Sequence, residues 1–377
     1  MDKLLSDQKH YCRAFIDNII IFSDTLDNHL KYLDDIFTLF ESRDIALSPA
    51  KSFIGYPSIE LLGFYVNAFG LSLTAQRTQG FRDLVFPKTL KALETYLGAA
   101  GFLHTMILYF AQLSEPLQRR KVAMLAEGRK SGRLTTGNPN ARAAYTRGRV
   151  FEPTAEELQS FNSLQEQLCN KLHLSHVDPD KPLFLQIDGS LEHGFGVMLF
   201  HLKPDFSWSP TTSIPSTAIL PVMFLSRYLT KAELSYGPSE LEVACLVWAC
   251  KRLCTILHLS NHRIIVLTDH NATRRIVNQT TLNTTSTDRA NRRLINASIY
   301  LSAYPLDVYH LPGRLNFVPD VLSRLEAVGD TQQRTRTAEP MLDNLWEKEA
   351  VLYIAEAQMS DDLKQQFANS YQKDTIY

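Results

Sequence analysis

Four acidic residues in the second half of the chain lie where the surrounding sequence is apolar. Asp188 ends the run LFLQID, and Asp269 ends the run RIIVLTD. Glu242 lies near the start of an apolar helical pattern, and Asp320 lies in an apolar turn-to-helix segment. Ligand sites in α/β sheets collect at the carboxyl ends of strands. If the two strands are neighbours, the carboxylates of Asp188 and Asp269 lie about 5 Å apart, one inter-strand spacing.

This grouping of carboxylates predicts a metal site. Unpaired carboxylates would repel one another and raise their pKa values. A pair of Mg²⁺ ions, with Mn²⁺ as a substitute, would remove that penalty, and Mg²⁺ prefers oxygen ligands. Two metals held by shared carboxylates suit in-line hydrolysis of a phosphodiester, because one activates water and the other stabilises the leaving oxygen. We therefore expect Asp188, Glu242, Asp269 and Asp320 to be the ligands of such a site.

Each acid also has an ordinary structural interpretation. Asp188 could form a turn ahead of Gly189, and Asp269 could cap the next helix. Glu242 could complete a capping box with Ser239, three residues before it. Asp320 could be a surface acid. The four acids together, in this order of strands and helices, are much less probable by chance than any one of them.

A fifth acid, Asp17, lies at the tip of an apolar hairpin in YCRAFIDNIIIFSD (11–24). A carboxylate in such a place is costly unless it has a function. The flanking residues have strand propensity, and Asp17-Asn18 has turn chemistry. A helix is predicted over 26–45, where apolar residues recur at helical spacing.

Composition sets outer limits on function. The chain has 377 residues, 45% of them hydrophobic and 21% charged, which is typical of globular proteins. Its net charge of −1 means that any affinity for nucleic acid must come from local patches. The five cysteines form no CxxC pair, so neither a zinc knuckle nor a disulfide framework is indicated. No apolar run approaches the roughly 20 residues that span a bilayer, and the first apolar stretch does not fit a signal peptide. We expect an intracellular protein, in cytoplasm or nucleus, with no membrane partner.

Composition and periodicity also divide the chain. Residues 119–150 hold nine Lys/Arg and one acid, Glu127, and they are interpreted as a basic flexible linker. Thr154 and Glu157 form a predicted capping box at the start of the next helix. The predicted divisions are 1–75, 76–118 (helices ending near Pro116), 119–150, 151–180 (a tether helix), 181–326 (an α/β domain) and 327–377 (a polar tail with short helices).

Several stretches of the second half resemble one family. LFLQIDGSLEHGFGVMLF, SELEVACLVWACKRL, RIIVLTDH and YHLPGRLNFVPDVLSRL are similar to the ribonuclease H domain of gypsy-type LTR-retrotransposon polymerases. The resemblance covers about 183–326 and implies a mixed five-stranded sheet with flanking helices. It places the catalytic acids at Asp188, Glu242, Asp269 and Asp320, with Glu240 competing for the helix position. His310 resembles the mobile histidine that assists product release.

The resemblance also implies a substrate, the RNA strand of an RNA–DNA hybrid. Such hybrids are read by shape and 2′-hydroxyl groups across the minor groove. Basic residues for the phosphates follow Asp269, and we expect nucleic-acid contacts from Arg274, Arg275, Arg289, Arg292 and Arg293. An ordinary solvated helix face is the alternative.

The first half resembles a partial reverse-transcriptase palm and a helical thumb. AFIDNIIIFSDTLDNHLKYL is similar to the palm segment that usually reads Phe/Tyr-x-Asp-Asp, and FPKTLKALETYLGAAGFL to the start of the thumb. Asn18 stands where the second aspartate belongs, and asparagine is a poor ligand for Mg²⁺. The upstream aspartate and the fingers are also missing from the printed sequence. Asp17 and Asn18 are therefore interpreted as a vestigial polymerase site, with polymerase activity lost.

The resemblance as a whole is to a retrotransposon pol polyprotein: the C-terminal part of reverse transcriptase, then a ribonuclease H domain, then a tail leading toward an integrase. The expected function is metal-dependent endonucleolytic cleavage of RNA in RNA–DNA hybrids, with other polyprotein segments as further partners. The alternative is a catalytically silent retroelement remnant that at most binds nucleic acid.

Overall fold

The computed structural model describes residues 1, 3–16, 18–134, 139–169, 173–191, 194–210, 212–270, 273 and 289–310, and for residues 139 and 289–291 only the backbone. The described residues fall into two compact units that divide between Ile59 and Glu60. None of the described helices is long and apolar enough to cross a membrane.

The first unit contains the predicted hairpin and helix. Strands β1 (Cys12–Phe15) and β2 (Asn18–Ile21) pair antiparallel, with Phe15 opposite Asn18. Helix α1 (Leu26–Glu41) begins at Thr25, whose hydroxyl accepts from the Asn28 amide at 3.3 Å. The hairpin is confirmed, and so is the helix, although it ends at Glu41. Asp17 lies outside the described residues.

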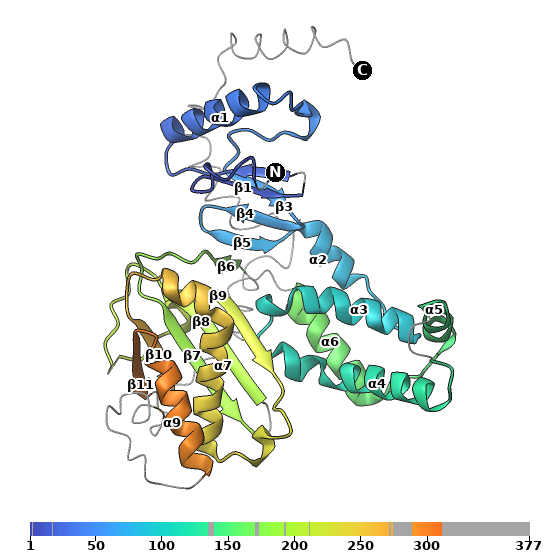
Figure 1. The fold of residues 1–377 in the computed structure, drawn as a ribbon. Helices are drawn as coiled ribbons and strands as arrows, with labels where there is room; N and C mark the ends of the chain where they lie inside the picture. The colour runs from blue at the N-terminus through green and yellow to red at the C-terminus, as the bar shows by residue number, and fades with distance from the viewer. Residues whose placement is uncertain are drawn as a thin grey trace, which may run out of the picture. The chain divides into compact units, whose positions relative to one another are not determined.

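The second unit is built on a mixed five-stranded sheet (Figure 1). Its strand order is β11-β10-β7-β8-β9, in which β7, β8 and β9 are antiparallel and β10 is parallel to both β7 and β11. The strands are β7 (Phe184–Ser190), β8 (Gly194–Leu202), β9 (Ile219–Arg227), β10 (Ile264–Thr268) and β11 (Leu306–His310). The expected mixed five-stranded sheet with flanking helices is confirmed.

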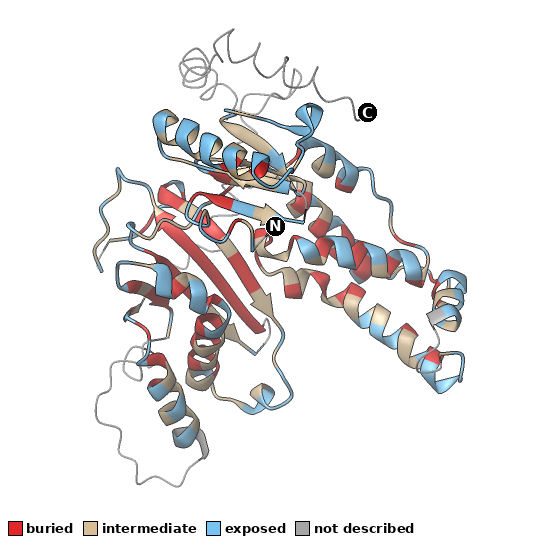
Figure 2. Ribbon diagram, turned by 45° about the horizontal axis from the view of Figure 1, so that its top comes forward, coloured by how far each residue is buried: buried red, intermediate tan, exposed pale blue. Residues whose placement is uncertain are grey.

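Both faces of this sheet are buried, because apolar side chains alternate between them (Figure 2). Leu185 and Val197 lie in a core with helix α7 (Pro238–Leu259) and helix α9 (Arg289–Leu301). Phe184 and Phe200 lie in a second core on the other side of the sheet. That second core is completed by residues of the preceding helical segment: Leu103, Met106, Ile107, Leu108 and Leu117.

The preceding helical segment runs through the predicted thumb and beyond it. It comprises α2 (Ala75–Arg82), α3 (Leu90–Phe102), the short helix η2 (His104–Met106), α4 (Phe110–Lys130), α5 (Pro139–Gly148) and α6 (Ala155–Cys169). Thr74 and Thr89 cap α2 and α3 with their hydroxyls, as their side chains are suited to do. A second sheet, of order β3-β4-β5-β6, joins β4 (Phe64–Asn67) and β5 (Gly70–Leu73) to β6 (His173–Ser175); β3 is Ser58–Leu61.

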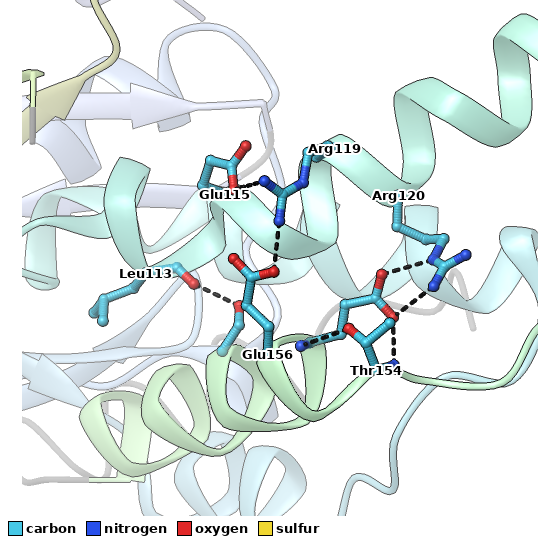
Figure 3. A network of polar contacts seen from close by, with 8 residues as sticks. Leu113, Glu115, Arg119, Arg120, Thr154 and Glu156 are labelled. Atoms are coloured by element: carbon cyan, nitrogen blue, oxygen red, sulfur yellow. Dashed lines mark hydrogen bonds and ion pairs between the residues drawn. The ribbon is translucent and has the colours of Figure 1, made fainter. Parts of the chain in front are cut away.

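The flexible linker predicted over 119–150 is wrong, because most of that stretch is helical. Helix α4 continues through Pro116 to Lys130, so the predicted helix end near Pro116 is also wrong, and α5 follows. Three of the basic side chains are paired with acids from outside the stretch, and Arg149 is paired with Glu127 within it. Arg119 donates to Glu156 at 2.7 Å, and Arg120 donates to Glu157 at 2.6 Å (Figure 3). Arg142 likewise pairs with Glu94.

The predicted capping box at the start of α6 is confirmed. The Thr154 amide donates to the Glu157 carboxylate at 2.9 Å, and the Glu157 amide donates to the Thr154 hydroxyl at 3.3 Å (Figure 3). Because Glu157 also binds Arg120, one carboxylate both caps α6 and joins it to α4. In the predicted tether region, helix α6 is therefore packed on α4.

An ion pair near the end of β9 gives a prediction about acid stability. Arg227 donates to both carboxylate oxygens of Glu233, at 2.8 and 2.7 Å, and its guanidinium lies over the Phe195 ring at 4.3 Å. The Arg227 hydrogen bonds lower the pKa of Glu233 from 4.5 to about 2, against the opposing effect of burial. Ionised Glu233 therefore stabilises the fold above pH 4.5, and this stability is lost as the pH falls toward 2.

We expect Glu233→Gln to lower the free energy of unfolding at pH 7 by about 1.5–3 kcal/mol, the range for hydrogen bonds to charged groups. The difference from the unsubstituted protein should shrink between pH 5 and pH 2. Urea unfolding across this range measures it. Glu156→Gln is the control, because its pair with Arg119 is exposed and screened by solvent, so its loss should change stability little at any pH. A difference that does not change with pH would contradict the assignment.

Candidate active site

Two of the predicted acids lie on neighbouring strands: Asp188 lies within β7, two residues before its end at Ser190, and Asp269 directly follows the last residue of β10. Strand β10 pairs parallel with β7, with Ile265 opposite Phe184 and Leu267 opposite Gln186. The same offset, continued two residues, sets Asp269 opposite Asp188. Asp188 is half-buried and Asp269 is exposed. The two strands are therefore neighbours, which is the condition on which the expected proximity of Asp188 and Asp269 depends.

Glu242 reaches these strand ends from the first turns of α7. Its side chain is buried, with 2% of its surface exposed. The Thr268 hydroxyl donates to one of its carboxylate oxygens at 2.6 Å, and the Gly189 amide donates to the other at 2.8 Å. Both donors are sequence neighbours of the strand-end acids. Glu242 is therefore held at the edge where Asp188 and Asp269 lie.

Burial raises the pKa of Glu242 to about 8. The hydrogen bonds from Thr268 and Gly189 act in the opposite direction, while the charges of Asp269 and Asp188 raise the pKa further. The three carboxylates are therefore close enough to influence one another electrostatically. Burial is the largest of these effects, and repulsion by the two neighbouring carboxylates acts in the same direction.

The competing glutamate, Glu240, has a different place. It is the N3 residue of α7, and its carboxylate accepts from the amide of the N-cap residue Gly237 at 3.0 Å; glycine has no side chain to return the bond. It also accepts from Arg293 at 2.7 Å. The capping box considered for Ser239 and Glu242 is wrong, because the helix begins two residues earlier and its cap uses Glu240.

Gly189 allows α7 to approach the sheet this closely. A Cβ atom at this position would lie 2.9 Å from the Leu241 carbonyl oxygen and 3.1 Å from a carboxylate oxygen of Glu242. Any side chain here would push α7 away from β7. The small residue after Asp188 therefore has a packing role that serves the acidic edge.

Asp188 has two partners that the sequence did not suggest. The Tyr109 hydroxyl donates to Asp188 Oδ2 at 2.9 Å, and the Cys245 thiol donates to the Asp188 carbonyl at 3.5 Å. Burial raises the pKa of Tyr109, and the charge of Asp188 raises it further, so the phenol stays protonated and donates. Tyr109 precedes the strand by many residues, and no local pattern marks it.

The other predicted residues divide into those near this edge and those outside the described part. His310 ends β11 beside Thr268, and its Nε2 donates to the Asp269 carbonyl oxygen at 3.0 Å. Arg292 is exposed on α9, whereas Arg293 is bound to Glu240 and lies over the Tyr236 ring. Asp320, Arg274 and Arg275, and the side chain of Arg289, lie outside the described residues.

The described residues fit a hard divalent cation only in part. The charges of Asp188 and Asp269 raise the pKa of Glu242, and Mg²⁺ prefers carboxylate oxygens as ligands. Among the residues that the structure describes, no three His, Cys, Asp or Glu side chains already form a metal-holding group. The fourth predicted ligand, Asp320, is not among them. The carboxylate oxygens of Asp188, Glu242 and Asp269 are donors of the kind that suits Mg²⁺.

The chain resembles known proteins over nearly all of its length. Residues 178–304 match the RNase H-like domain found in reverse transcriptase. The Tf2-7 and Tf2-3 transposon polyproteins of Schizosaccharomyces pombe are each 23% identical to it over 363 residues, which are 96% of this chain and 23% of each polyprotein. The chain thus spans about a quarter of the length of the curated relatives it matches.

Solved structures of foamy viral protease-reverse transcriptase share the fold. The complex with an RNA/DNA hybrid has a TM-score of 0.58 and 18% identity, covering 90% of this chain and 39% of that one. The complex with dsDNA has a TM-score of 0.59 and 18% identity, covering 83% and 56%. Together, these matches show that residues 178–304 are similar to the RNase H-like domain found in reverse transcriptase and that the chain as a whole is similar to part of a retrotransposon polyprotein, which supports its being a pol polyprotein fragment.

Proposed function

We propose that the chain hydrolyses the RNA strand of RNA–DNA hybrids at internal positions, leaving a 3′-hydroxyl and a 5′-phosphate. The observation that carries this proposal is the convergence of Asp188, Glu242 and Asp269 at one edge of the mixed sheet, with Glu242 fixed by Thr268 and Gly189. A structural role alone does not explain a buried glutamate facing two other acids, because burial without a counter-charge is costly.

The carboxylates of the proposed site would act by holding divalent cations in a fixed geometry. Two divalent cations, when bound, supply the positive charge that activates water and stabilises the leaving oxygen. The two hydrogen bonds to Glu242 fix both of its oxygens, so this ligand needs no rearrangement. Asp320 is proposed as the fourth ligand. His310 is proposed to assist product release, because it lies on the strand beside Asp269 and hydrogen-bonds its carbonyl oxygen.

The proposed substrate follows from the family and from the exposed cations. Solved structures of foamy viral protease-reverse transcriptase, which share this fold, are complexes with an RNA/DNA hybrid and with dsDNA. Arg292 is exposed on α9 and is available to a phosphate. Arg274, Arg275 and Arg289 remain proposed phosphate contacts. Arg293 is a weaker candidate, because Glu240 already binds it.

A cleavage assay with the 377-residue chain tests the proposal. The substrate is a hybrid with separate labels on the RNA and DNA strands, and the controls are single-stranded RNA and duplex DNA of the same sequence. We expect cleavage of the hybrid's RNA strand in Mg²⁺ or Mn²⁺ and none with excess EDTA. Binding of the hybrid without cleavage, under all of these conditions, would overturn the proposal in favour of a silent remnant.

We also propose that this chain does not extend a primer. Asn18 begins β2 opposite Phe15 and presents an amide where the resembled palm has a second carboxylate. An amide keeps the shape but not the charge that a Mg²⁺ ligand supplies. A primer-extension assay with an RNA template and all four deoxynucleotides should therefore give no product, beside an active reverse transcriptase as positive control. Extension by this chain would contradict the prediction.

A further inference from the structure

A tyrosine from the helical segment reaches the acidic edge of the sheet. Tyr109 lies between η2 and α4, outside residues 178–304 that match the RNase H-like domain. Its hydroxyl is 2.9 Å from Asp188 Oδ2, and because a carboxylate oxygen only accepts, the phenol donates. A hydrogen bond from a neutral donor to an ionised acceptor is among the stronger kinds in proteins.

A glycine on the neighbouring strand makes room for this phenol. Gly196 on β8 lies directly opposite Asp188 on β7. A Cβ atom on Gly196 would lie 2.5 Å from Cε1 of Tyr109, which is closer than any real contact. The strand therefore lacks a side chain at the position that the tyrosine ring occupies. This observation is independent of the hydrogen bond and points to the same arrangement.

The backbone that carries the tyrosine is in an unusual conformation and is held in place. Tyr109 has φ 53° and ψ 32°, the left-handed region that non-glycine residues rarely adopt. Its neighbour Leu108 is buried in the core shared with the sheet. The Ala111 amide donates to the Ser226 hydroxyl on β9 at 2.9 Å. Uncommon backbone conformations persist where the surroundings fix them, often beside functional sites.

From these contacts we propose that Tyr109 is a positioning residue of the nuclease site. Its hydroxyl fixes the rotation of the Asp188 carboxylate, so that this ligand meets a divalent cation without rearranging. Outer partners of metal-binding carboxylates commonly act in this way. The inference rests on the proposed function and adds to it that the site is completed by a residue from outside the RNase H-like domain.

The test is Tyr109→Phe in the full 377-residue chain, because this change removes only the hydroxyl. Its matched control is Tyr96→Phe, since Tyr96 is also buried in the helical segment and its hydroxyl donates to the Phe161 carbonyl oxygen, at 3.4 Å. Binding of Mn²⁺, followed by electron paramagnetic resonance, gives a readout that does not depend on activity. Steady-state cleavage gives kcat, KM for the hybrid, and the Mg²⁺ concentration for half-maximal rate.

We expect Tyr109→Phe to weaken Mn²⁺ binding and to raise the half-saturating Mg²⁺ concentration by about 10- to 100-fold, as for other outer partners. KM for the hybrid should not change, and Tyr96→Phe should match the unsubstituted chain in every readout. Gly196→Ala should reproduce the metal defect, because the added methyl displaces the ring.

Two outcomes for Tyr109→Phe would overturn the inference. One is unchanged Mn²⁺ binding and unchanged Mg²⁺ dependence. The other is tighter metal binding, which would mean that the hydroxyl competes with the cation for Asp188. Failure of the proposed function is distinguishable, because the unsubstituted chain would then not cleave the hybrid, while the comparison of Mn²⁺ binding still decides the role of Tyr109.

Discussion

Asp188→Asn is expected to abolish cleavage of the hybrid's RNA strand, by a factor of about 10³ or more. The estimate assumes that charge stabilisation by a metal is worth several kcal/mol and that each 1.4 kcal/mol is about tenfold in rate. Asparagine has nearly the shape of aspartate, and its carbonyl oxygen can still accept from Tyr109. The substitution therefore removes the charge at the strand end while it leaves the packing intact.

The control for this substitution is Asp307→Asn. Asp307 lies on β11 of the same sheet, but it is paired with Arg263 away from the acidic edge. The two variants carry the same chemical change, and both should give the circular dichroism spectrum of the unsubstituted chain. Only Asp188→Asn should lose Mg²⁺-dependent cleavage. Cleavage by folded Asp188→Asn at the rate of Asp307→Asn would remove Asp188 from the proposed site.

Phe200→Ala is expected to give the largest loss of stability, about 3–5 kcal/mol, as for other large-to-small changes in cores. Phe200 is fully buried in the second half of β8, and its ring stacks on Phe184 with 5.3 Å between centroids. It lies in the core that Leu108 and Leu117 of the helical segment share with the sheet. The cavity would therefore open between two elements and could not be closed by moving a single side chain.

Phe69→Ala is the control, because Phe69 is 53% exposed near the turn between β4 and β5. Such a surface change is expected to stay within about 0.5 kcal/mol. Urea unfolding followed by circular dichroism measures both variants. A loss of less than 1 kcal/mol for Phe200→Ala, estimated against the same principle, would mean that the helices and the sheet do not share this core in solution.

The sequence predicted those parts of the site that depend on local pattern. Asp188 and Asp269 were recognisable because each ends an apolar run, and strand ends are where a sheet presents ligands. Glu242 was recognisable as an acid in an apolar helix. The hairpin of β1 and β2 and the capping box of Thr154 and Glu157 also follow from local sequence rules.

The errors arose where distant residues decide the outcome. The stretch 119–150 looked like a solvated basic linker because only Glu127 lies within it. Its other counter-charges, Glu94, Glu156 and Glu157, lie before and after it in the chain and meet it only in the fold. Pro116 is another case, because packing holds it within α4 although its ring disfavours a helix interior.

Tyr109 could not have been found from the sequence for the same physical reason. Its role depends on a left-handed backbone position, on the missing side chain of Gly196 and on a strand far along the chain. Thr268 could be noticed in the sequence because it precedes Asp269, but its role as a donor to Glu242 is visible only in the fold. Contacts between residues that are far apart in the sequence leave no local pattern of apolar and polar residues from which they could be predicted.

The residues that share the second core extend beyond the residues that match the RNase H-like domain. The RNase H-like domain model matches residues 178–304, but the core that buries Phe184, Phe200 and Phe224 also contains Leu103, Ile107 and Leu117 of the preceding segment. A polypeptide cut at residue 178 would present these aromatic rings to water. Such an exposed apolar face favours self-association. We therefore expect the RNase H-like domain to be stable only when the preceding segment is present to cover this face of its sheet.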